Sequence, residues 1–136
     1  MAKVSIHSSL ANNSLIETYA KDLSLFLNEI SLSGMIGRNG GFERNMAAQS
    51  SGVMKVHVKI PEEPAWPASV RQISRTSDNY LVYARHWDYS DYFQIIALIS
   101  PDAHKMADRL LPKIIDIADK DFHDLNLSQL NALTTY

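Results

Sequence analysis

The segment Tyr92–Ile99 constrains the fold most, because apolar side chains occupy both of its faces. A strand of this kind is buried on both sides and lies inside a sheet. The residues Ser100-Pro101-Asp102 follow at once, with a hydroxyl, a proline and an acid in the order typical of a helix start. The sequence therefore predicts a central strand that leads directly into a C-terminal helix.

Hydrophobic periodicity predicts the other main elements. A helix is expected from about Leu15 to Leu32, behind a capping box at Ser14–Glu17. Val53–Ile60 alternates between an apolar and a basic face, and shorter strands are expected at Val70–Ser74 and Asn79–His86. These elements predict an α+β fold: a small antiparallel sheet of three to four strands, packed with N- and C-terminal helices on one sheet face.

Other segments carry weaker signals. The first dozen residues are polar and are expected to be frayed. Met35–Gly52 is rich in glycine and asparagine, which predicts a functional loop or a partly helical connection. Pro112 is expected to kink or restart the C-terminal helix, and Ser128 to cap a short final helix.

Length and composition predict one domain that spans residues 1–136. The chain has no cysteine, no signal-like N-terminus and no apolar run of about 18 residues, so a cytoplasmic protein without membrane association is expected. The net charge of −2 argues against strong non-specific binding of nucleic acid. Between Met35 and His86, however, seven basic residues oppose four acidic ones.

This basic middle contains a candidate site for an anion. Lys55, His57 and Lys59 share the polar face of one predicted strand. Arg71 and Arg75 belong to the next predicted strand or follow it directly. If the two strands are neighbours, these side chains form a cationic platform with one titratable group. Guanidinium groups match phosphate oxygens and imidazole transfers protons near neutral pH, a combination that suits RNA cleavage without a metal.

The alternatives stay open for each of these residues. The arginines fit an ordinary solvated strand and turn, and His57 fits a solvated strand histidine. His104 and Lys105 lie near a helix N-terminus, which attracts anions, but they equally fit a packing residue and an exposed helix residue. Five histidines without cysteine give no metal-ligand spacing, so no metal and no cofactor is expected.

Several motifs resemble the YafO family of bacterial toxins. They are Arg71-Gln72-Ile73-Ser74-Arg75-Thr76-Ser77-Asp78, then Leu81-Val82-Tyr83, then Pro101-Asp102-Ala103-His104-Lys105-Met106-Ala107. Upstream, Gly37-Arg38 and Val56-His57-Val58 match further elements of the family. The resemblance covers about residues 34–123. Asn39 departs from it, since the family has aspartate there, and the segment from Leu125 to Tyr136 has no counterpart.

The resemblance implies the toxin of a type II toxin–antitoxin module, which cleaves mRNA on the ribosome and is inhibited by a cognate antitoxin protein. By looser analogy it implies a fold like that of the RelE superfamily. Chemistry assigns the roles of the residues, and the expected catalytic residues are His57, Arg71, Arg75 and His104. The expected RNA- and phosphate-binding residues are Arg38, Lys55, Lys59, Ser74, Thr76, Tyr83 and Lys105. The alternative function is a non-catalytic protein that blocks translation by binding RNA or the ribosome.

Overall fold

A computed structural model describes all residues, 1–136, of the chain. The strands are β1 (Lys3–Ile6), β2 (Ile36–Gly41), β3 (Val53–Val58), β4 (Tyr80–Arg85) and β5 (Tyr92–Ile99). The helices are α1 (Ser14–Leu27), α2 (Met46–Ser50), α3 (Ala103–Ile117) and α4 (Leu127–Ala132). A π-helical segment, Ala118–His123, continues α3, and short 3₁₀ turns lie at Ser8–Leu10 and Gln72–Ser74.

The strands form one five-stranded sheet in the order β1-β5-β4-β3-β2. The pairs β2–β3, β3–β4 and β4–β5 are antiparallel, and β1 pairs parallel with β5. The predicted α+β class is confirmed, but the sheet is larger than the predicted three to four strands and is mixed. The prediction missed β1, because four residues are too few for periodicity and their partner lies almost ninety positions further along the chain.

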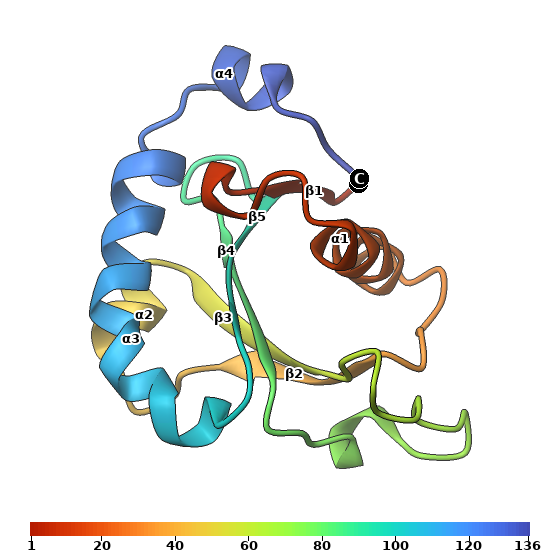
Figure 1. The fold of residues 1–136 in the computed structure, drawn as a ribbon. Helices are drawn as coiled ribbons and strands as arrows, with labels where there is room; N and C mark the ends of the chain where they lie inside the picture. The colour runs from red at the N-terminus through yellow and green to blue at the C-terminus, as the bar shows by residue number, and fades with distance from the viewer.

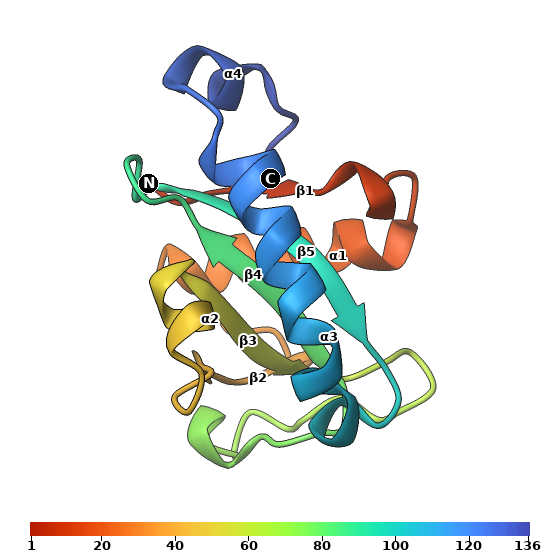
Figure 2. The ribbon, with the colours of Figure 1, turned by 90° about the vertical axis from the view of Figure 1, so that its left-hand side faces the viewer.

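Helices cover both faces of the sheet rather than one (Figure 1). Helix α1 packs on one face, while α3 and the short α2 pack on the other (Figures 1 and 2). Strand β4 separates two apolar cores, because Tyr80 and Val82 point to the α3 side while Leu81 and Tyr83 point to the α1 side. The prediction of a single helical layer was therefore wrong.

The segment Met35–Gly52 is more regular than its composition predicts. It contains β2, which pairs with β3, and α2, which is capped by the Asn45 side chain at the Ala48 amide. Pairing with β3 outweighs the low strand propensity of the glycines. The predicted strand at Val70–Ser74 is absent, and only a 3₁₀ turn within a long loop occupies this stretch.

Helix ends also differ from the predictions. Asn13 rather than Ser14 caps α1, and its side chain accepts from the Leu15 and Ile16 amides. Helix α3 begins after Asp102 and continues through Pro112. Asn126 rather than Ser128 caps α4, in a capping box with Gln129. No helix is both long enough and apolar enough to span a bilayer.

The C-terminal segment folds back onto the sheet. The Leu130 side chain is completely buried in the α3-side core. At the chain end, the Tyr136 amide donates to the Val4 carbonyl at 2.9 Å, which covers part of the outer edge of β1. This contact protects an edge strand that would otherwise expose unpaired backbone groups.

Replacing Leu130 by alanine is expected to lower the free energy of unfolding by about 2 to 4 kcal/mol, because it leaves a cavity in the core. Leu127, in the same helix but 43% exposed, is the matched control, and Leu127→Ala should cost less than about 1 kcal/mol. Urea unfolding of both variants measures the difference. Equal losses would show that α4 is not docked in this way.

Candidate functional site

Four elements place basic or aromatic side chains around one end of the sheet. Strand β3 presents Lys55 and His57 on the face that α3 covers, because Val56 and Val58 point into the opposite core. Strand β2 adds Arg38, whose charge acts on Lys55 and His57. Tyr80 of β4 and His104 of α3 complete the group. These five residues, Arg38, Lys55, His57, Tyr80 and His104, are called the cationic site below.

His57 is held by the backbone of Ser77. Its Nδ1 lies 2.8 Å from the Ser77 amide nitrogen and 2.9 Å from the Ser77 carbonyl oxygen. Its Nε2 makes no hydrogen bond with the protein, so this atom faces a ligand or solvent. Burial lowers the pKa of His57; the Ser77 bond opposes this shift, and the positive charges nearby add to it. The imidazole is therefore neutral at pH 7, as a general base requires.

Lys55 lies between two aromatic rings. Its Nζ is 4.6 Å from the centre of the Tyr80 ring and 4.9 Å from that of Phe42. Burial lowers the pKa of Lys55, and the charge of Arg38 lowers it further. None of the three ion pairs in the structure includes a residue of the cationic site. A lysine without a carboxylate partner, oriented by aromatic faces, is well suited to bind a phosphate.

The sheet surface beside Lys55 is bare. Gly40 of β2 lies opposite Lys55 in the register of the β2–β3 pair. A Cβ atom at Gly40 would meet no other atom within 4 Å. A glycine in a strand often marks a place where another chain approaches the backbone closely. An extended ligand therefore has room to lie over β2 next to Lys55.

Tyr80 was not among the predicted site residues, although it contacts most of the cationic site. It lies opposite His57 in the β3–β4 pair, and the two rings meet edge to face with centroids 4.9 Å apart. Its hydroxyl is 3.3 Å from His104 Nδ1. No pattern along the chain predicts this role, because a tyrosine in a strand is more often a core residue.

The N-terminus of α3 does not offer free amides to an anion. The Asp78 carbonyl accepts from the Ala103 amide, and the Asp78 carboxylate accepts from the His104 amide at 3.1 Å. The expected anion site at this helix end is therefore occupied by the protein itself. The side chains of His104 and Lys105 are exposed and remain available for a phosphate.

The Arg75 side chain is buried in the protein, and the residue is only 3% exposed. Its guanidinium donates to four backbone carbonyls, those of Ser33, Ile36, Pro67 and Val70, at 3.0 to 3.3 Å. These bonds tie the loop after β3 to the start of β2. With one N–H left and almost no exposure, Arg75 cannot hold a substrate phosphate, so its expected catalytic role is not retained.

Gly37 precedes Arg38 in the Gly-Arg motif, and the local packing requires a glycine there. A Cβ atom at Gly37 would lie 2.5 Å from the Arg75 carbonyl oxygen and 2.7 Å from the Trp66 ring. The Arg38 amide donates to that same carbonyl at 2.8 Å. Only glycine permits this close approach, which fixes the backbone from which Arg38 extends.

Four further predicted residues lie outside the cationic site. Arg71, Ser74 and Thr76 are exposed on the loop before β4, with no side-chain hydrogen bond to the protein. Lys59 lies over the ring of Trp66, with Nζ 4.7 Å from its centre.

Tyr83 is fully buried on the α1 side, where its hydroxyl donates to Asn39 at 2.6 Å. The expected binding of RNA by Tyr83 is therefore not retained. No three His, Asp or Glu side chains converge as possible metal ligands.

A family model described as "Toxin YafO, type II toxin-antitoxin system" matches residues 17–124 of the chain. The chain belongs to the YafO toxin family. The match contains the whole cationic site and reaches further toward the N-terminus than the motifs do, to include most of α1. No curated protein and no solved structure matches significantly. As a type II toxin, the protein pairs with an antitoxin.

In this YafO toxin, Arg75→Ala is expected to lower the free energy of unfolding by about 3 kcal/mol, because four carbonyls lose their donor inside the protein. Arg71→Ala, which removes an exposed arginine from the same loop, should cost less than about 0.5 kcal/mol. Chemical unfolding compares the two variants. An Arg75→Ala protein as stable as the wild type would exclude this structural role.

The lowered pKa of His57 predicts a pH dependence of stability. Below pH 6.5 the unfolded chain takes up a proton at His57 before the folded protein does, so stability falls as the pH decreases through this range. His57→Asn, which keeps a polar group near Ser77, should give a shallower decrease. Unfolding free energies from pH 7.5 to 5 measure the slope, and an unchanged slope would contradict the assignment.

Proposed function

We propose that this toxin is a ribosome-associated endoribonuclease that cleaves mRNA without a metal and thereby inhibits translation. The observation that carries the proposal is the grouping of a neutral histidine with an unpaired lysine and an arginine around a bare strand. Proton transfer and stabilisation of phosphate charge are the two tasks of RNA cleavage by the RNA's own 2′-hydroxyl.

In the proposed reaction, His57 Nε2 accepts the proton of the 2′-hydroxyl as its oxygen attacks the adjacent phosphorus. The bond from phosphorus to the 5′-oxygen breaks, and that oxygen takes up a proton. The products are a 2′,3′-cyclic phosphate and a 5′-hydroxyl end. Lys55 and Arg38 stabilise the negative charge that develops on the phosphate oxygens. His104, with Lys105 beside it, supplies the second proton-transfer group or binds the next phosphate.

The exposed loop before β4 extends this surface. Arg71, Ser74 and Thr76 bind phosphates further along the RNA, and Lys59 adds charge beside Trp66. The net charge of −2 gives weak attraction for free RNA. Delivery of mRNA by the ribosome supports cleavage despite this weak attraction, because it removes the need for tight binding to naked RNA.

The test is to add the purified toxin to a translating extract and to map new mRNA 5′ ends, with ribosome-free mRNA as the control. New 5′-hydroxyl ends that appear only during translation are expected. Translation arrest without new ends would overturn the nuclease and favour the alternative, a non-catalytic translation blocker that uses the same basic surface.

Substitutions at two neighbouring glycines of β2 test where the substrate binds. Gly40→Leu fills the bare surface next to Lys55 and should abolish cleavage, while the fold should be retained because a Cβ atom at this position meets no other atom within 4 Å. Gly41→Leu is the matched control, since Gly41 lies opposite Met54, which packs on the α1 side, and also has open space. Gly41→Leu should cleave at the wild-type rate. Full activity of Gly40→Leu would place the substrate elsewhere.

A further inference from the structure

We infer that Tyr80 is a positioning residue for the cleavage reaction, which holds His104, His57 and Lys55 in one arrangement. The inference rests on the proposed function for its catalytic part. Its structural part, the orientation of the His104 ring by a phenol hydroxyl, is separately measurable.

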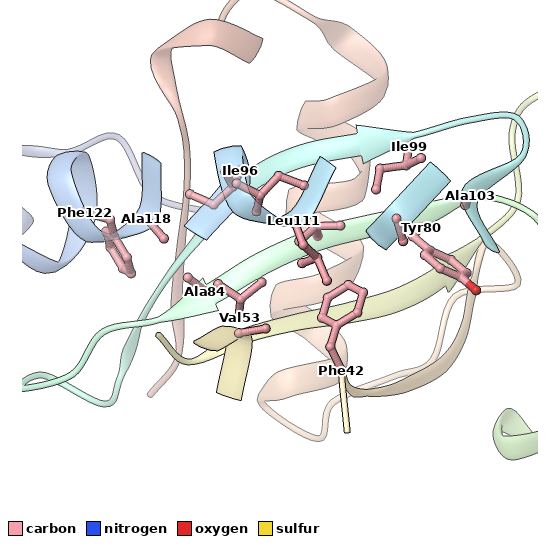
Figure 3. Packing of buried hydrophobic residues seen from close by; sticks show 14 of the residues in the cluster. Phe42, Val53, Tyr80, Ala84, Ile96, Ile99, Ala103, Leu111, Ala118 and Phe122 are labelled. Atoms are coloured by element: carbon pink, nitrogen blue, oxygen red, sulfur yellow. The ribbon is translucent and has the colours of Figure 1, made fainter. Parts of the chain in front are cut away.

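Tyr80 lies where the α3-side core meets the cationic site. Its ring belongs to the apolar cluster beneath α3, and the residue is only 3% exposed. Figure 3 shows the Tyr80 oxygen at the margin of this cluster, at the same end as Ala103. The ring is thus immobilised by core packing while its hydroxyl reaches the first turn of α3.

Each contact of Tyr80 restrains a different group of the cationic site. The hydroxyl lies 3.3 Å from His104 Nδ1, the ring edge meets His57, and the ring face lies 4.6 Å from Lys55 Nζ. His104 is exposed, and its side chain makes no hydrogen bond other than the one with Tyr80. Without that bond, the His104 ring would be free to rotate in solvent.

This hydrogen bond decides which ring nitrogen of His104 faces the protein. Burial raises the pKa of Tyr80, and the Asp78 carboxylate adds to the shift, so the phenol keeps its proton. The hydroxyl donates to His104 Nδ1 or accepts from it according to the tautomer of the ring, and in both cases Nδ1 is held by the protein while Nε2 stays free. His57, through Ser77, and His104, through Tyr80, both use Nδ1 for the protein and leave Nε2 for the substrate.

Tyr80→Phe tests the inference, because it removes the hydroxyl and keeps the ring that contacts Lys55 and His57. Cleavage in the translating extract is expected to fall about tenfold, as for the loss of one orienting hydrogen bond, with an altered pH profile. In a His104→Ala background the same change should have no further effect. Tyr92→Phe is the matched control, because it also removes one hydroxyl from a tyrosine of the α3-side core, which donates to Asn131, and its cleavage rate should equal that of the wild type.

The second measurement is an NMR spectrum of the histidine rings in the free protein. In Tyr80→Phe, the ring signals of His104 should change, whereas Tyr92→Phe should leave them as in the wild type. If the wild type cleaves and Tyr80→Phe cleaves equally fast with the same pH profile, the inference is overturned. If the wild type generates no new 5′ ends, the proposed function fails, and an unchanged His104 ring spectrum in Tyr80→Phe then overturns the structural part as well.

Discussion

The burial of β4 between two helical layers is the constraint on which the rest of the structure depends. Leu81, Val82 and Tyr83 are completely buried and alternate between the two cores. A strand of this kind needs apolar cover on both faces, so α1 and α3 must lie on opposite sides of the sheet. Tyr80, at the start of β4, is where the α3-side core meets the cationic site.

Arg75 stabilises the backbone next to the cationic site, although its side chain is not part of that site. A buried guanidinium without a carboxylate partner is costly unless its donors are satisfied, and here four backbone carbonyls satisfy most of them. These carbonyls belong to two segments, 33–36 and 67–70, that lie on either side of β3 in the sequence. The arginine therefore fixes the loop that carries Arg71 and Ser77, and Ser77 in turn holds His57.

The cationic site is assembled from β2, β3, β4 and α3, which lie far apart in the sequence. The sequence predicted a role for Arg38, Lys55, His57 and His104, because charge, alternation and motif spacing are visible along the chain. The prediction placed Arg75 beside His57 because it assumed a strand at Val70–Ser74. The true neighbour of β3 is β4, so Tyr80 takes the position opposite His57.

The sequence by itself determined the α+β class, the interior strand β5, the helices that begin near residues 14 and 103, and the family. Those features depend on local periodicity, capping residues and motif spacing. Only the tertiary structure decided that β1 joins the sheet, that Arg75 is buried, and that Tyr80 rather than Tyr83 faces the site. Strand pairing and burial depend on contacts between distant segments, and a one-residue difference in register moves a side chain to the opposite face. The same arginine or tyrosine in a motif therefore becomes a ligand group or a structural one according to the backbone that surrounds it.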